Sequence, residues 1–340
     1  MAKNKFKILT IVFFVLVISV TGAGFFFFQE ISSFVTEPLN PLAAEKVFSI
    51  KPGQNFATIA RNLKTEAIIS SQAYFKLFVK YKKAGKKLQA GEYLLSAAKS
   101  PEQILEILLK GKVKLHRITI PEGMNLKEVA ALVDTAGFCG KKHFFDLCHD
   151  KTFIASFGIS AISLEGYLFP DTYFFPKTAD CKAVIKTMVA HFNDIFTQEW
   201  KNQAKAMGFL VHEIVTLASI IEKETGDPLE RPLISSVFHN RLKKKMRLES
   251  DPTIIYGIKN FDGNIKRKHI KMVTPYNTYQ IKGLPLGPIA NPGAKSLFAA
   301  LNPAQTPFLF FVSKKDTTHQ FSKTIQEHNR AVRRYQLGKK

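Results

Sequence analysis

The sequence predicts an α+β protein with a single N-terminal transmembrane helix, and three observations lead to that fold class. The first is an uncharged apolar stretch from residue 8 to residue 28. The second is a strand-turn-helix pattern that occurs twice, beginning near residues 48 and 118. The third is an amphipathic helix from Phe209 to Gly226 with two glutamates near its end. Strand and helix signals mixed in this way indicate small α+β modules followed by a mixed α+β domain.

The apolar stretch 8–28 is long enough to cross a membrane. Its 21 residues contain neither charge nor proline, and at 1.5 Å per residue they match a hydrocarbon core of ~30 Å. Three lysines lie in residues 1–7, whereas the first charges after the stretch are glutamates. This bias places residues 1–7 in the cytoplasm as a short tail and the rest of the chain outside it.

A cleaved signal peptide is the alternative for this stretch. Gly22, Ala23 and Gly24 are small enough for a cleavage site, but they lie inside an apolar run that continues to Phe28. That run is longer than the apolar region of a signal peptide, which favours an uncleaved anchor. The predicted location is therefore the cytoplasmic (inner) membrane, single-pass, with a periplasmic or extracytoplasmic main body. Residues 29–45 contain two prolines and little periodicity, and they are predicted to form a linker.

The overall composition excludes a disordered chain and disfavours a nucleic-acid partner. Hydrophobic residues make up 46% and charged residues 22%, which is typical of globular proteins. The formal net charge of +22 would suggest nucleic acid in a cytosolic protein. Because the predicted anchor exports the basic part, anionic lipid headgroups or an acidic polymer are the expected partners, and a solvated lysine face is the alternative.

The three cysteines are too few for a disulfide scaffold, and no Cys-x-x-Cys pair points to zinc. No metal site is predicted. In an oxidising compartment Cys139 and Cys148 are one possible pair, but spacing alone leaves the pairing open.

The repeated pattern occupies residues 46–134. Phe48–Leu63 and Ile118–Val133 each combine a strand, a turn with glycine and asparagine, and a helix. Such a repeat argues for small repeated α+β modules rather than one long domain. The pattern resembles the glycan-binding LysM module, and a unit that merely packs against its neighbours is the alternative.

The helix 209–226 has an apolar stripe that includes Leu217 and Ile221. Glu224 lies seven residues after Leu217 and three after Ile221, so its carboxyl group projects from the apolar side of the last turn. Desolvation and the negative end of the helix dipole should both raise its pKa, as a general acid requires. In the alternative interpretation, Glu222 and Glu224 are ordinary helix-end carboxylates and Glu224 points to solvent.

Two aromatic segments have the composition of a sugar-binding surface. Leu164–Pro176 sets Glu165 and Asp171 among five aromatic residues, including Tyr167, although an aromatic core loop would look similar. Residues 274–293 form a predicted loop of twenty residues, and loops of this length in compact domains are usually functional. This loop contains three polar candidates, namely Tyr276, Asn277 and Tyr279.

Further candidates lie between the central helix and this loop. A second amphipathic helix is predicted from Pro232 to Met246 and contains Asn240 and Arg241. Asp251 then stands at a helix start before a proline, where it needs no function beyond capping. Glu249 and Tyr256 flank this position.

Six short motifs follow one another in the second half of the chain: Ala218–Thr225, Phe238–Leu242, Ser250–Gly257, Tyr276–Tyr279, Gly283–Pro285 and Ala290–Gly293. Together with Glu165–Tyr173 they resemble the endolytic murein transglycosylase family, the YceG-like proteins. The resemblance covers nearly the whole chain, and several motifs in order are strongly specific. It implies that residues 135–340 form a transglycosylase catalytic domain.

The resemblance assigns the catalytic glutamate to Glu224. It implies cleavage of the β-1,4 bond between N-acetylmuramic acid and N-acetylglucosamine without water, with one carboxyl group as acid and then base, leaving a 1,6-anhydro end. No metal or cofactor is implied. The expected partners are peptidoglycan glycan strands, in particular nascent ones, the cytoplasmic membrane, and peptidoglycan synthases as candidates. Glu249 is a departure, because glutamine is expected there. The predicted substrate-binding residues are Glu165, Tyr167, Asp171, Asn240, Arg241, Glu249, Asp251, Tyr256, Tyr276, Asn277 and Tyr279.

Two other functions compete with this one. A hydrolytic muramidase would use Glu224 with a second carboxylate, namely Asp251, Glu249 or Glu165. A non-catalytic, membrane-anchored scaffold would bind glycan through the repeated modules. Product analysis separates all three, because hydrolysis leaves a reducing muramic acid end and a scaffold cleaves nothing.

Overall fold

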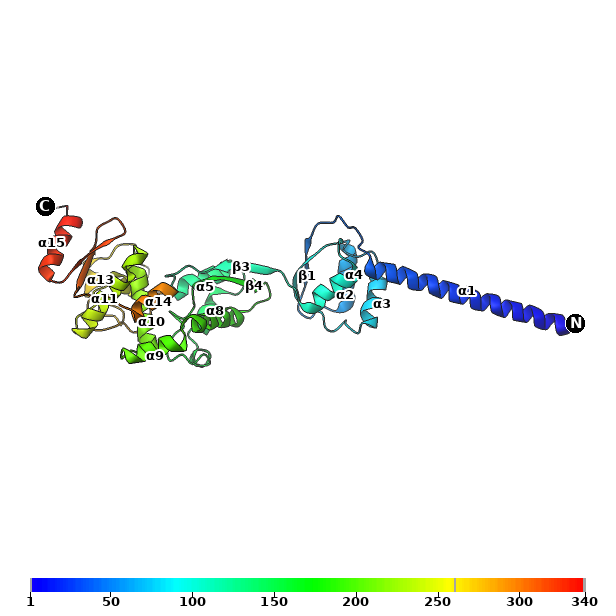
Figure 1. Ribbon diagram of the computed structural model, residues 1–340, viewed down its shortest axis with the longest axis horizontal. Helices are drawn as coiled ribbons and strands as arrows, with labels where there is room; N and C mark the ends of the chain where they lie inside the picture. Colours follow the sequence, from blue (N-terminus) through cyan, green and yellow to red (C-terminus); the bar gives the residue numbers. More distant parts are fainter. Residues whose placement is uncertain (1, 260, 339–340) are drawn as a thin grey trace. The chain divides into compact units, whose positions relative to one another are not determined.

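The computed structural model describes residues 2–259 and 261–338, and the chain forms two compact units (Figure 1). The smaller unit is Met1–His116 together with Pro176–Thr178, and the larger is Arg117–Phe175 with Ala179–Lys340. Helices and strands are mixed in both, so the α+β class is confirmed. The division falls after residue 116 rather than residue 134, because the second strand-turn-helix unit packs into the core of the larger unit.

Helix α1 (Ala2–Thr36) contains the predicted apolar stretch. Its segment Leu9–Thr36 is long and apolar enough to cross a membrane. The helix extends beyond residue 28 through eight residues that were predicted to be linker. This prediction was wrong because residues 29–36 contain no proline or glycine, and the helix ends only where Glu37 precedes Pro38. Met1 of the predicted tail lies outside the described residues.

The smaller unit has the order strand, helix, helix, strand, helix after α1. Strand β1 pairs antiparallel with β2, so that Lys46 lies opposite Leu95 and Ile50 opposite Gly91. Phe48 on β1 and Tyr93 on β2 are fully buried and form the centre of a separate core. The elements are β1 (Lys46–Ile50), α2 (Phe56–Thr65), α3 (Gln72–Tyr81), β2 (Gly91–Leu95) and α4 (Pro101–Lys110).

The two strand-turn-helix units share the local structure that their sequences predict. In the first, Gly53 has a φ of 75°, and Asn55 caps α2. In the second, Gly123 has a φ of 78°, and Asn125 caps α5 (Leu126–Thr135). Left-handed backbone is easy for glycine, and an asparagine side chain satisfies the free N–H groups of a helix start. The relation of these units to LysM modules stays a prediction.

Helix α10 (Val211–Glu224) is the central helix of the larger unit. Eight consecutive residues, Ile214–Ile221, are buried, so the helix is covered on all sides rather than along one stripe. The polar residues within this run are satisfied internally. Thr216 donates to the carbonyl of His212, and Ser219 donates to the carbonyl of Thr216. The surrounding helices are α9 (Gln198–Ala206), α11 (Arg231–Lys243), α12 (Asp251–Gly257) and α14 (Ala294–Leu301).

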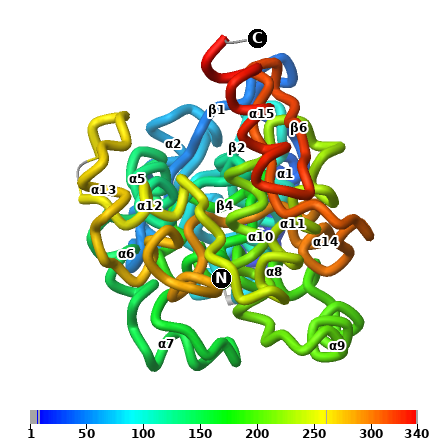
Figure 2. Tube along the Cα trace, turned by 90° about the vertical axis from the view of Figure 1, so that its left-hand side faces the viewer, coloured from blue at the N-terminus to red at the C-terminus, as the bar shows by residue number. Residues whose placement is uncertain are grey.

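The remaining elements lie around this helical centre. Strand β5 pairs antiparallel with β6, and Figure 2 shows α15 beside this hairpin. Residues 272–293 contain neither helix nor strand, as predicted for the long loop. The remaining elements are β3 (Leu115–Thr119), α6 (Lys141–Leu147), α7 (Lys151–Ala155), β4 (Thr172–Pro176), α8 (Cys181–Ile195), η1 (Pro228–Glu230), α13 (Arg267–Lys271), β5 (Phe310–Ser313), β6 (His319–Ser322) and α15 (Ile325–Tyr335). Strands β3 and β4 form a two-stranded sheet.

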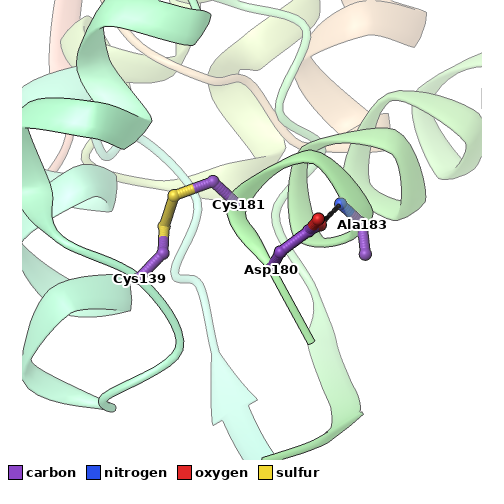
Figure 3. Close-up of a disulfide and its surroundings, with 4 residues drawn as sticks. All are labelled: Cys139, Asp180, Cys181 and Ala183. Atoms are coloured by element: carbon purple, nitrogen blue, oxygen red, sulfur yellow. Dashed lines mark hydrogen bonds between the residues drawn. A yellow bond between two sulfur atoms is a disulfide. The ribbon is translucent and has the colours of Figure 1, made fainter. Parts of the chain in front are cut away.

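A disulfide joins Cys139 to Cys181, where α8 begins next to its capping residue Asp180 (Figure 3). The Cα atoms of the two cysteines are 5.4 Å apart. The pairing of Cys139 with Cys148 that the sequence left open does not form. The seven-residue helix α6 separates these two positions by about 10 Å, which is beyond the reach of a disulfide. Cys148 is instead a buried free thiol.

Candidate active site

Glu224 ends α10 and faces the start of α12. Its Oε1 accepts a hydrogen bond from the Ser250 hydroxyl at 2.6 Å. Burial raises the pKa of Glu224 to about 7, and the hydrogen bond from Ser250 partly opposes this shift. The negative charge of Asp251 raises the pKa further, whereas Arg241 lowers it. The residue as a whole is neither fully buried nor exposed, and a carboxyl group with this pKa is half protonated near neutral pH.

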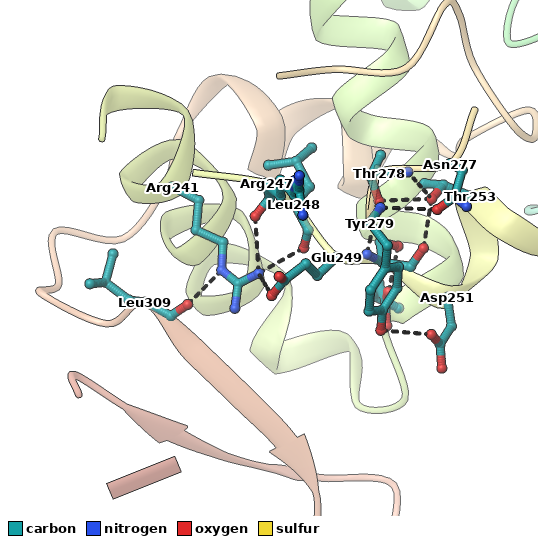
Figure 4. Close-up of polar contacts among 12 residues, drawn as sticks. Arg241, Arg247, Leu248, Glu249, Asp251, Thr253, Asn277, Thr278, Tyr279 and Leu309 are labelled. Atoms are coloured by element: carbon teal, nitrogen blue, oxygen red, sulfur yellow. Dashed lines mark hydrogen bonds and ion pairs between the residues drawn. The ribbon is translucent and has the colours of Figure 1, made fainter. Parts of the chain in front are cut away.

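Ser250 is held in place by two buried threonines, Thr253 and Thr278. Figure 4 shows these two threonines next to each other. Its N–H donates to Thr278 Oγ1 at 3.0 Å, and its carbonyl accepts from Thr253 Oγ1 at 2.6 Å. The two threonine hydroxyls are 2.8 Å apart. Ser250 occupies the N-cap position of α12, but its side chain makes no capping bond. The sequence predicted Asp251 as the helix cap, which was wrong, because Ser250 holds that position and Asp251 is the first residue of the helix. The sequence therefore offered no signal for the contact of Ser250 with Glu224.

Arg241 and Glu249 form an ion pair beside this serine, with Arg241 Nη1 3.2 Å from Glu249 Oε2. Arg241 is buried, and it also donates to the carbonyls of Leu309 at 2.7 Å and Leu248 at 2.9 Å (Figure 4). The Glu249 side chain remains 45% exposed. Arg241 therefore fixes the backbone just before Ser250 and holds the Glu249 carboxylate at the edge of the site.

Tyr279 connects the long loop to the same cluster. Its hydroxyl donates to Asp251 Oδ1 at 2.8 Å (Figure 4). Burial raises the pKa of Tyr279, and the charges of Asp251, Glu224 and Glu249 act in the same direction. Tyr279 is therefore close enough to all three carboxyl groups for each of them to affect its pKa.

Glu165 belongs to a second, more deeply buried cluster. It is 3% exposed, and both carboxyl oxygens lie 3.0 Å from the N–H of Leu126, the first residue of α5. Tyr256 donates to Oε2 at 2.8 Å, and Asn291 Nδ2 is 3.4 Å from Oε1. Burial raises the pKa of Glu165 to about 7. The ring of Tyr276 packs on Tyr256, with centroids 4.8 Å apart.

The other predicted substrate-binding residues contact the protein itself. The Tyr167 hydroxyl is 2.9 Å from His212 Nδ1, and its ring is buried. Asp171 is exposed, and its Oδ2 lies 3.4 Å from His191 Nδ1. Asn240 donates to the carbonyls of Thr306 and Phe308.

Asn277 is fully buried, and its Nδ2 donates to the carbonyls of His269, Ile270 and Met272. Of the eleven predicted substrate-binding residues, the structure therefore gathers Arg241, Glu249, Asp251 and Tyr279 around Glu224. Glu165, Tyr256 and Tyr276 form the second cluster.

Glu222 lies two residues before Glu224 but in a different environment. Its Oε2 accepts from the N–H of Gly293 at 3.0 Å, and its Oε1 is 3.3 Å from Arg231 Nη2. The side chain is 7% exposed. Glu222 is thus a charge-neutralised contact between α10 and the segment before α14.

The geometry puts Glu224, a carboxylic acid with a raised pKa, among the polar side chains of Ser250, Arg241, Glu249, Asp251 and Tyr279. Such a group is able to give and to recover a proton near neutral pH. Among residues 2–259 and 261–338, no group of three or more His, Cys, Asp or Glu side chains is placed to hold a metal ion.

Comparison with known proteins identifies the class. The sequence model of the YceG-like family matches residues 48–334, so the chain belongs to that family. The endolytic murein transglycosylase of Bacillus subtilis is 36% identical over 304 residues, which cover 84% of each chain. The protein of the same name from Streptococcus pneumoniae serotype 2 is 28% identical, over 96% of this chain and 65% of that protein. A solved structure of a yceG-like protein from Listeria monocytogenes is similar, with 33% identity, a TM-score of 0.59, and coverage of 84% of this chain and 98% of that one.

Proposed function

We propose that this protein is an endolytic lytic transglycosylase, a lyase that cleaves bonds between N-acetylmuramic acid and N-acetylglucosamine within peptidoglycan strands. The Bacillus subtilis relative, whose name is endolytic murein transglycosylase and which is similar over most of both chains, supports the substrate class. The observation that carries the proposal is Glu224, a carboxyl group with a pKa raised to about 7 and one oxygen held by Ser250.

In the proposed reaction Glu224 acts twice. The protonated carboxyl group gives its proton to the glycosidic oxygen as the bond from that oxygen to C1 of the muramoyl ring breaks. The resulting carboxylate then takes the proton of the C6 hydroxyl while O6 bonds to C1. This closes the 1,6-anhydro ring and restores the carboxylic acid, so no water is consumed.

The neighbouring groups support both steps. Because Ser250 occupies Oε1, Oε2 is the oxygen available to exchange the proton. Positive charge develops on the sugar ring during cleavage. The carboxylates of Asp251 and Glu249, held by Tyr279 and Arg241, are placed to stabilise that charge.

Mass spectrometry of the products from purified glycan strands tests this function. The proposal expects new ends that are 1,6-anhydro-N-acetylmuramic acid, lighter by one water than reducing ends. A hydrolytic muramidase is the second candidate, favoured by the two further carboxylates beside Glu224, and it would give reducing ends. A glycan-binding scaffold would leave the strands intact.

We further propose that α1 is an uncleaved single-pass anchor with its N-terminus in the cytoplasm. Three lysines in residues 1–7 favour this orientation, and the disulfide Cys139–Cys181 fits an oxidising compartment outside it. Protease added to spheroplasts should digest the chain after residue 36 without membrane lysis. Protection of that part would overturn the topology, and a mature protein lacking residues 1–24 would show that the helix is a signal sequence.

Anchoring would confine the enzyme to nascent strands. After α1 only residues 37–45 precede β1, and nine residues span at most about 30 Å. The smaller unit is therefore held close to the membrane surface, where we propose that it binds glycan as a LysM-like module beside the peptidoglycan synthases. Replacing residues 1–28 with a cleavable signal peptide tests this, because released protein at equal abundance should fail to restore normal strand length.

A further inference from the structure

A basic pocket lies beside the end of α12. Its volume is about 820 Å³, and its lining includes Lys259, Lys268, His269 and Lys271. The three lysine side chains are exposed, and within the described residues none of them forms an ion pair. The nearby Asp262 pairs with Lys266 at 2.5 Å, and Lys266 is not part of the lining. The pocket therefore presents uncompensated positive charge.

The wall of this pocket also contains an unsatisfied hydroxyl. Thr274 Oγ1 is buried and has no hydrogen-bond partner within the part of the chain that the structure describes. It lies against Gly257, where an added Cβ would be 3.2 Å away. Buried polar atoms in folded proteins nearly always have a partner, and this oxygen lies behind the pocket surface, so the wall would have to shift before it could meet a ligand.

The pocket is tied to Glu224 through two elements. Helix α12 runs from Asp251 in the carboxylate cluster to Gly257 in the pocket wall, a rise of about 9 Å. Gln280 Nε2 donates to the carbonyl of Ile270 at 2.7 Å, which adds to the three bonds of Asn277 to the end of α13. Tyr279, which contacts Asp251, lies between Asn277 and Gln280 in the sequence. The same loop therefore contacts both the end of α13 and the residues around Glu224.

We propose that this pocket binds the carboxylates of the peptide stems attached to muramic acid, on a sugar near the bond that Glu224 cleaves. The inference rests on the proposed function. The exposed lysine ammonium groups of the lining are suitable donors for carboxylate oxygens. A peptide substituent of the bound strand reaches a concave site one short helix from the acid, whereas a lipid headgroup would have no such relation to Glu224. The pocket thereby selects peptide-bearing strands.

The test compares two forms of one substrate. Uncrosslinked strands with intact peptide stems are cleaved by the full chain in neutral detergent, beside the same strands whose peptide carboxyl groups have been converted to methylamides. We expect the amidation to raise KM about twofold to thirtyfold, the range that two exposed ion pairs together would give. For intact strands, the double variant Lys268→Gln, Lys271→Gln should have the KM that the unmodified protein has for amidated strands. Amidation of the strands should not raise the KM of this variant further.

A matched control removes two lysines elsewhere. Lys182 and Lys186 are exposed on one face of α8, and Lys182→Gln, Lys186→Gln should keep the preference of the unmodified protein. Equal KM for both substrates in the unmodified protein would overturn the inference while leaving the chemistry intact. The inference would also fail if the double lysine variant raised KM for intact and amidated strands by the same factor. It would fail as well if the variant differed from the unmodified protein only in anionic detergent, because that result would assign the pocket to lipid headgroups. Failure to cleave either substrate would remove the proposed function itself.

Discussion

Glu224 and Glu165 are two carboxyl groups with the same raised pKa and different surroundings. Burial raises both pKa values to about 7. Glu165 is 3% exposed and is contacted by the N–H of Leu126, the Tyr256 hydroxyl and the Asn291 amide. Within the described residues, Glu224 accepts one hydrogen bond, from Ser250, and stays partly accessible. A raised pKa alone therefore does not identify a general acid, since an open oxygen is needed as well.

The largest expected effect follows from replacing Glu224. Glu224→Gln keeps the shape but cannot give or recover a proton, so the cleavage rate should fall about 10²- to 10⁴-fold. The thermal unfolding temperature should change little, because a single hydrogen bond to Ser250 is involved. Initial rates on purified strands and a melting curve measure both quantities. Activity equal to that of the unmodified protein would assign the acid elsewhere.

Removing the disulfide tests whether the segment that contains Glu165 contributes to stability rather than to catalysis. Cys139 and Cys181 enclose residues 140–180, including Glu165. Opening this loop, whose two cysteines are 42 positions apart, should lower the free energy of unfolding by about 2–4 kcal/mol. Cys139→Ser, Cys181→Ser and the double variant should lose equal amounts in urea titrations, with kcat of the folded protein unchanged. Unequal losses would show that the two cysteines are not partners.

Glu165→Gln should affect stability rather than chemistry, the opposite of Glu224→Gln. An amide oxygen at the Oε2 position still accepts from Leu126 and Tyr256, but the amide nitrogen then lies at the Oε1 position and faces two other donors, the Leu126 N–H and Asn291 Nδ2. This donor–donor contact should cost about 1–3 kcal/mol at pH 5. The contribution of Glu165 to stability also depends on pH, and its direction follows from the raised pKa. Because the folded pKa of about 7 exceeds the ordinary value of 4.5, Glu165 favours folding at low pH, and this stability is lost as pH rises from 4.5 through 7. Urea titrations at pH 5 and pH 8 measure the free energy of unfolding at each pH. Its decrease from pH 5 to pH 8 should be smaller for the variant than for the unmodified protein. A large loss of kcat with unchanged stability would reverse the roles of the two glutamates.

The smallest expected effect concerns Ser250. Ser250→Ala removes the hydrogen bond that lowers the pKa of Glu224, so the alkaline limb of the pH–rate profile should move to higher pH. Although more of the acid is then protonated at pH 7, we expect kcat at that pH to fall about tenfold, equivalent to roughly 1.4 kcal/mol, because the carboxyl group is no longer held in position by Ser250. Ser250→Thr keeps the hydroxyl and should keep the profile. A uniform decrease without a shifted limb would mean that Ser250 acts only in packing.

Local spacing determined a substantial part of this protein. The apolar run of residues 8–28, the shared turn with Gly53 and Gly123, and the position of Glu224 on the apolar side of its helix all depend on neighbours within about one helical turn or one tight turn. These preferences act before any tertiary contact forms. The structure keeps the long apolar helix, the two glycine turns and the raised pKa of Glu224, although α10 is covered on all sides rather than along one stripe. The six ordered motifs likewise pointed to the YceG-like family, which the comparisons confirm.

Only the tertiary structure decided which distant groups meet. Ser250 reaches Glu224 across 26 positions, Glu165 reaches the start of α5 across 39, and Cys181 rather than Cys148 meets Cys139 across 42. A serine before Asp-Pro and a glutamate among aromatic residues have the same local appearance whether they hold the fold or touch a substrate. Their partners depend on how the helices pack around α10, because short-range hydrogen bonds and disulfides form only between groups that packing brings within a few ångströms.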